Sequence, residues 1–165
     1  MTIISQNLKV LHAELDWLTV VITQTMSSYF LQEGHESDWQ DLPLPVLDPN
    51  TAYGKLISQY QLDRYSRLAI ALTLAPHLRP QALDVFYSKN ALYDRGFTEF
   101  GGQTRKEHLG FLPTAQTLNF LLTAKEQSLY EKFLDLFLPT HVLQQKQIIS
   151  LTEMAPNLPQ WSGLL

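Results

Sequence analysis

The sequence predicts a mainly α-helical domain with a long N-terminal helix and at most a short β-hairpin, in an arrangement that could be winged-helix-like. Three observations support this fold class. Apolar residues recur at helical spacing over the first thirty residues, with no Gly or Pro before Gly34. Thr or Asp precedes several later apolar segments, where its side chain can cap a helix. Four of the seven glycines fall between Asn90 and Pro113, where the helical pattern stops.

The N-terminal helix is predicted from Ile3 to about Glu33. Its main apolar stripe, with alternating spacings of four and three, consists of Ile4, Leu8, Leu11, Leu15, Leu18, Ile22, Thr25 and Tyr29. A second apolar face carries Trp17, Val20, Val21 and Phe30. Two alternatives follow. Both faces pack in the core of this domain, or one face packs on another subunit as a coiled-coil-like seam along Leu8–Tyr29.

Capping residues and prolines place the helices in the middle of the chain. After a loop, Thr51 is predicted to cap a helix that runs to about Tyr60. Asp63 caps the next helix, which is expected to end near Pro76. Pro80 then begins a third, short helix, because proline is tolerated in the first turn.

The last third of the chain is predicted from glycines, aromatics and β-branched residues. Residues 90–113 form a glycine-rich loop or a short irregular hairpin. Thr114 caps a helix through about Ala124, and a further helix is expected over 126–138. Residues 144–152 are predicted as a short strand, because Ile148, Ile149 and Leu151 are clustered there.

Composition limits the classes of function. The 165 residues include no cysteine, which excludes disulfides, thiolate metal sites and a cysteine nucleophile and fits a cytoplasmic location. No run of about 18 apolar residues predicts a membrane span. The formal net charge of −4 is opposite to that of a typical phosphate-backbone binder, so we do not expect a nucleic-acid partner.

No catalytic constellation is recognisable. The pair Gly54-Lys55 is followed by Leu56 and has Pro49 where a P-loop requires glycine. The five histidines are scattered, without the spacing of three or four that metal ligands on one helix have. Glu14 and Asp16 are two apart on a helix and point to different faces, so they are no carboxylate dyad. We therefore expect no enzyme activity, no metal and no cofactor.

The glycine-rich loop is the predicted partner-binding site. Its candidate contact residues are Tyr93, Asp94, Arg95, Phe97, Glu99, Phe100, Gly101, Gly102, Phe111, Leu112 and Thr114. Its charges balance, with Arg95, Arg105 and Lys106 against Asp94, Glu99 and Glu107, and this balance disfavours a phosphate site. One alternative is a structural loop whose aromatic residues are anchored in the core. A second is a loop that contacts a partner protein, and a third is a loop that contacts nucleic acid or a small ligand.

Most of the chain, from about Leu15 to Leu151, resembles a known family, and the resemblance is densest over Leu74–Thr114. The residues that carry the resemblance are Leu74-Ala75-Pro76-His77-Leu78-Arg79-Pro80, Leu83-Asp84-Val85-Phe86, Asn90-Ala91-Leu92-Tyr93-Asp94-Arg95-Gly96-Phe97-Thr98-Glu99-Phe100-Gly101-Gly102 and Gly110-Phe111-Leu112-Pro113-Thr114. They are similar to the N-terminal region of AAA+ ATPases that are encoded with phage-tail-like contractile injection systems. The family tends to have glycine at the position of Leu109, and the chain departs from its pattern there.

The resemblance implies a non-catalytic, helical and winged-helix-like domain that recruits a partner or helps order an ATPase ring. It implies residues 1–34 as a long helix, 35–155 as the domain and 156–165 as the start of a linker to an ATPase module. ATP would then be bound only by that module. Two alternatives stay open. One is a winged-helix DNA-binding regulator that uses the helix 114–124, and the other is a ligand binder lined by Tyr53, Tyr60, Tyr65 and Phe86.

Overall fold

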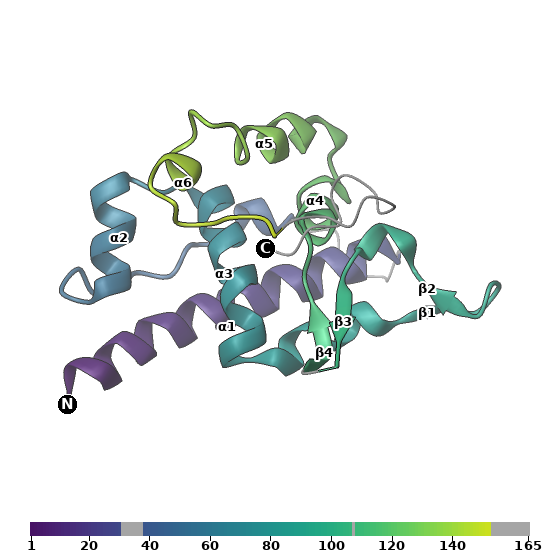
Figure 1. Cartoon of the computed structure of the whole chain (residues 1–165), viewed down its shortest axis with the longest axis horizontal. Helices are drawn as coiled ribbons and strands as arrows, with labels where there is room; N and C mark the ends of the chain where they lie inside the picture. Colours follow the sequence, from purple (N-terminus) through teal and green to yellow (C-terminus); the bar gives the residue numbers. More distant parts are fainter. Residues whose placement is uncertain (31–37, 107, 153–165) are drawn as a thin grey trace.

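The computed structural model describes residues 1–30, 38–106 and 108–152, and it confirms the mainly helical class. One long helix, α1, crosses the molecule, and the shorter helices pack along one part of it (Figure 1). Two small antiparallel strand pairs complete the fold, where the sequence predicted at most one.

Helix α1 spans Ile3–Tyr29, and the Thr2 side chain caps it by accepting a hydrogen bond from the Ser5 N–H at 3.1 Å. The predicted extension to Glu33 lies outside the described residues. The main stripe is largely buried from Val10 onward, and the second face is buried in part: Trp17 and Val21 are enclosed, whereas Val20 and Phe30 are exposed. Because α1 contacts α2, α3 and α4, most of this stretch packs in the core of its own domain, as the first alternative expects. The seam with another subunit stays a prediction.

The predicted caps of the next two helices are confirmed. Helix α2 spans Ala52–Tyr60 with Thr51 as its N-cap, and α3 spans Arg64–Leu78 with Asp63 as its N-cap. The predicted end of α3 at Pro76 was two residues early. Pro76 lies inside the last turn, where the fixed φ of proline fits a helix and only one backbone hydrogen bond is lost. The short 3₁₀ helix η1, Trp39–Asp41, precedes α2.

The segment after α3 contains the strands. A 3₁₀ helix, η2, spans Pro80–Tyr87 and is followed by β1, Lys89–Asn90, which pairs with β2, Arg95–Gly96. The β1–β2 pair and its turn form an arm that extends away from the helices (Figure 1).

A second strand pair follows the arm. After the 3₁₀ turn η3, Thr98–Phe100, strand β3, Gln103–Arg105, pairs with β4, His108–Leu112, through an irregular register. Both pairs are antiparallel and two-stranded.

After β4, the elements of the described residues are all helical. Thr114 precedes α4, Ala115–Thr123, and shares a reciprocal capping box with Thr117. The predicted helix 126–138 divides into η4, Gln127–Leu129, and α5, Tyr130–Asp135.

The predicted strand at 144–152 is wrong. Val142–Gln145 form the short helix α6, and the chain then turns at Gln147, whose φ is 53°. The Ile148 N–H bonds to the Leu143 carbonyl at 2.9 Å, and Ile149 is buried. These isoleucines therefore close a helix end against the core, and the cluster of β-branched residues indicated burial instead of a strand.

Candidate partner-binding site

The arm exposes two large apolar side chains at its tip. Leu92 is 80% exposed and Tyr93 is 63% exposed. The turn is ordered by the Asn90 side chain, which accepts from the Leu92 N–H at 3.0 Å, and by Asp94, which has a φ of 49°. The Arg95 guanidinium lies 5.5 Å from the centroid of the Tyr93 ring, within cation–π range. The tip is thus a small apolar surface on a turn with its own local contacts.

An aromatic cluster anchors the base of the arm. Phe100 is fully buried, and its ring centroid lies 4.7 Å from that of Phe120, 5.0 Å from Phe97 and 5.7 Å from Phe86. Tyr29 reaches the same cluster from the end of α1, with its centroid 6.0 Å from that of Phe100. This part of the loop matches the structural alternative, in which the aromatics are core residues.

Two glycines make the turn between η3 and β3 possible. Gly101 and Gly102 have φ values of 64° and 89°, in the region that favours glycine. The Gly102 N–H donates to the Thr114 hydroxyl at 3.2 Å, so this turn also docks on the start of α4. A Cβ on Gly102 would lie 2.2 Å from the Phe111 ring.

We expect Gly102→Ala to destabilise the domain by about 1–3 kcal/mol, because strained backbone and a steric clash coincide there. The matched control is Gly96→Ala in the arm, where an added Cβ has no neighbour within 4 Å. Denaturation curves of the two variants in urea would measure the difference in the free energy of unfolding. Equal losses in both variants would contradict this account of the turn.

A cleft of about 460 Å³ lies between the arm and β3. Its lining residues are Phe86, Tyr87, Lys89, Gly96, Phe97, Gly101, Gly102, Gln103, Thr104 and Phe111. Four of them are aromatic, and Lys89 is the single charged residue in this described lining. The volume is in the range of ordinary ligand or peptide side-chain sites. We name it the arm cleft.

The predicted contact residues separate by burial. Tyr93, Asp94 and Arg95 are exposed on the arm. The half-buried ones are Phe97, Glu99, Gly101, Gly102 and Leu112, and the buried ones are Phe100, Phe111 and Thr114. The structure therefore brings the predicted contact residues together around one hairpin region. The buried residues anchor this region in the core, and the exposed residues are accessible to a partner. Glu107 lies outside the described residues.

Sequence reasoning missed several members of this region. It did not select Leu92, although Leu92 precedes Tyr93 in the turn and is the more exposed of the two. It also did not assign Tyr87 and Lys89 to the site, and it placed Phe86 in the alternative ligand site instead. The available signal was the aromatic pair directly before the glycine-rich stretch.

A buried ion pair was also missed. Glu14 is completely buried on α1, and Arg67 on α3 binds it bidentately, with Nε–Oε1 at 2.8 Å and Nη2–Oε2 at 2.6 Å. The Tyr53 hydroxyl donates to Glu14 Oε1 at 2.9 Å, and Arg67 Nη2 also donates to the Pro45 carbonyl at 3.0 Å. Burial, together with the charge of Glu14, raises the pKa of the Tyr53 phenol. The network ties α1, α2, α3 and the loop together and is enclosed, so its role is structural.

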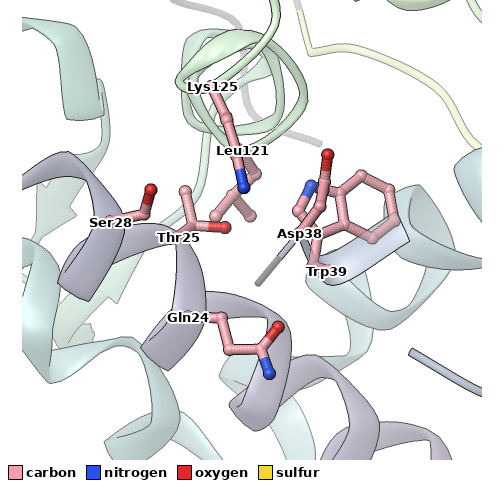
Figure 2. Close-up of a pocket in the computed structure, with 7 residues that line it drawn as sticks. All are labelled: Gln24, Thr25, Ser28, Asp38, Trp39, Leu121 and Lys125. Carbon is pink, nitrogen blue, oxygen red and sulfur yellow. The ribbon is translucent and has the colours of Figure 1, made fainter. Parts of the chain in front are cut away.

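A small polar pocket lies where α1, η1 and the end of α4 meet. Figure 2 shows the side chain of Lys125, which follows the end of α4, extending toward Thr25 on α1, with Asp38 and Trp39 on the other side of the pocket. Its volume of about 10 Å³ is the size of one water molecule. The Thr25 hydroxyl is buried without a hydrogen-bond partner among the described residues. The pocket is too small for a substrate.

The residues of the two alternative functions are placed as follows. Most of α4 is buried, including Leu118, Phe120 and Leu121, so this helix has little free face for a DNA groove. Tyr53 bonds Glu14, Tyr60 lies under Lys146, and Tyr65 packs on Trp39. Phe86 belongs to the aromatic cluster. Each of the four aromatic residues of the predicted ligand site thus contacts different side chains of the domain.

Within the described residues, no group of three or more His, Asp or Glu side chains is placed to hold a metal ion. The helices of the same residues include none with the length and hydrophobicity needed to cross a membrane. Comparison of the chain with protein-family models, curated proteins and solved structures gave no match.

Proposed function

We propose that this chain is a non-catalytic protein-interaction domain that holds an extended segment of a partner protein at the β1–β2 arm and the arm cleft. The observation that carries the proposal is the exposure of Leu92 and Tyr93 on a projecting, ordered turn. Exposed aromatic residues next to a preformed cleft are typical anchors of protein interfaces.

The arm cleft supports an extended segment as the occupant. Its floor is aromatic, through Phe86, Phe97 and Phe111, and would accept an apolar side chain. Strands β3 and β4 form a two-stranded sheet within the described residues, and an extended partner segment would add a strand to it. Lys89 at the same cleft would pair with an acidic residue of the partner.

The resemblance suggests the setting of this contact. A domain at the N-terminal end of a AAA+ ATPase would recruit an injection-system component or help order the ATPase subunits. ATP would then bind to the ATPase module and not to this domain. The placement in that family, and the winged-helix-like description that comes with it, belong to the proposal.

Site-specific cross-linking tests the contact. A photo-reactive residue in place of Tyr93, in the full protein in its own cells, is expected to cross-link one defined protein. The same residue in place of exposed Lys55 on α2 should not. With that protein purified, the variant carrying Leu92→Ser and Tyr93→Ser should bind about tenfold or more weakly, because interface aromatics are frequent hot spots.

The double substitution lies on an exposed turn, so thermal unfolding should not change. Cross-linking of the same proteins from positions 93 and 55, or unchanged affinity of the double variant, would overturn the proposal.

A further inference from the structure

A second cleft lies on the other side of η3, and it has a distinct chemistry. Its volume is about 490 Å³, and it is bounded by the end of α1, by η3, by α4 and by the start of α5. The lining residues are Tyr29, Glu99, Gln116, Asn119, Phe120, Thr123, Ala124, Gln127 and Tyr130. Three of these described residues are aromatic, Tyr29, Phe120 and Tyr130, and one is ionised, Glu99. We name the cleft after this residue, the Glu99 cleft.

The charge of the Glu99 cleft has one sign. Glu99 supplies a carboxylate, and the nine lining residues, all within the described chain, include no Lys, Arg or His. An anionic ligand would therefore meet repulsion, whereas a cationic group would find its counter-charge.

The carboxylate of Glu99 is held in place. The Tyr29 hydroxyl donates to Glu99 Oε1, and this hydrogen bond raises the pKa of Tyr29, so the phenol stays protonated as a donor. The Gln116 Nε2 donates to the backbone carbonyl of Glu99 at 3.1 Å and fixes η3 against α4. Within the described part of the chain no hydrogen bond reaches Glu99 Oε2, so the carboxylate keeps acceptor capacity for a ligand.

Aromatic rings and amide carbonyls complete the lining. The Tyr29 and Phe120 rings pack on each other nearly perpendicularly, 84° apart with centroids at 5.1 Å, and Phe120 is buried, whereas Tyr130 is 41% exposed at the cleft. A flat cation can stack on the exposed Tyr130 ring while it donates to the Glu99 carboxylate. Gln116 and Asn119 add amide oxygens, and Asn119 Oδ1 has no hydrogen-bond partner among the described residues.

We infer that the Glu99 cleft binds a guanidinium group, carried either by an arginine side chain of a protein segment or by a small free guanidine. A guanidinium combines the three features that the cleft matches: positive charge, a planar face for stacking and several N–H donors. An ammonium has the charge but neither the plane nor the fork of donors. The inference concerns a different cleft from the arm cleft and does not rest on the proposed function.

Titration of the isotope-labelled domain, followed by NMR at about 0.15 M salt, tests the site. Nα-acetyl-arginine amide is expected to shift the amides of Glu99, Gln116 and Tyr130. Nα-acetyl-citrulline amide has the same shape without the charge and should bind about tenfold or more weakly. Agmatine and a tripeptide with a central arginine distinguish a free guanidine from a side chain in a peptide.

Glu99→Gln is expected to weaken arginine-amide binding about tenfold, because a hydrogen bond to a charged group is lost. The glutamine carbonyl can still accept from Tyr29, so the thermal unfolding of this variant should match the unaltered domain. Glu131→Gln on the exposed face of α5, outside the cleft, is the control and should leave binding unchanged. The assignment would be overturned if Nα-acetyl-citrulline amide or Nα-acetyl-lysine amide bound as tightly as the arginine amide. It would also be overturned if the Glu99→Gln variant bound the arginine amide as tightly as the unaltered domain.

Discussion

Replacing Arg67 by Met is expected to lower the free energy of unfolding by about 3–5 kcal/mol, because it leaves the buried Glu14 carboxylate without its partner. Glu14 on α1 is completely buried where the helix faces α3, and Arg67 on α3 provides two charge-assisted hydrogen bonds to it. Methionine retains much of the aliphatic volume of arginine, so the loss would come mainly from the charge. Chemical denaturation in urea or guanidinium chloride measures it.

A second ion pair on the same two helical regions is the matched control. Arg79 Nη1 lies 2.6 Å from Asp16 Oδ1, and the Asp16 side chain is largely exposed. Arg79→Met should cost about 1 kcal/mol or less, because an exposed pair is solvated in both the folded and unfolded states. If Arg67→Met cost no more than Arg79→Met, the buried pair would not carry the stability assigned to it.

Removing both charges separates the ion pair from the packing. The double variant Glu14→Leu with Arg67→Leu should recover a large part of the loss of Arg67→Met, since no buried charge remains unpaired. The Tyr53 hydroxyl and the Pro45 carbonyl would lose their partners, so recovery is expected to be incomplete. A double variant less stable than Arg67→Met would show that the pair itself is strongly favourable.

Local signals of the sequence predicted the helices well. Thr51, Asp63 and Thr114 cap helices as expected, because an N-cap depends on a side chain and a backbone N–H two or three residues away. The stripe on α1 was also predictable, since the spacing of three and four fixes one face. Long-range pairing could not be predicted from these local signals. Glu14 meets Arg67 across 53 residues, and nothing in a helical repeat marks a glutamate as a core residue.

The candidate site was predictable in outline only. The glycines and aromatics of residues 90–113 indicated an irregular region with exposed and anchored parts, and the structure has both. Which aromatic is anchored depends on tertiary contacts: Phe100 is buried by rings from α1, η2 and α4, whereas Tyr93 in the same segment is exposed. The sequence carries no local mark for that difference.

Replacing Phe100 by Ala is expected to destabilise the domain by about 3–5 kcal/mol, the range for removing a buried phenylalanine. Phe100 is fully enclosed and contacts five other rings, those of Tyr29, Phe30, Phe86, Phe97 and Phe120. The cavity would open directly under the arm and beside both clefts. Phe100→Leu keeps most of the volume and should cost about 1.5 kcal/mol or less, apart from the lost ring contacts.

The Phe100→Ala variant also separates the roles of the two parts of the loop. Its loss of stability should appear in thermal or chemical unfolding. Any loss of partner binding should be explained by the fraction of the variant that is unfolded. Leu92→Ser with Tyr93→Ser should show the reverse, with unfolding unchanged and binding lost, because these side chains are exposed and contribute little to the core. If Phe100→Ala kept full stability, or if the tip variant unfolded first, the division into a buried anchor and an exposed contact surface would be wrong.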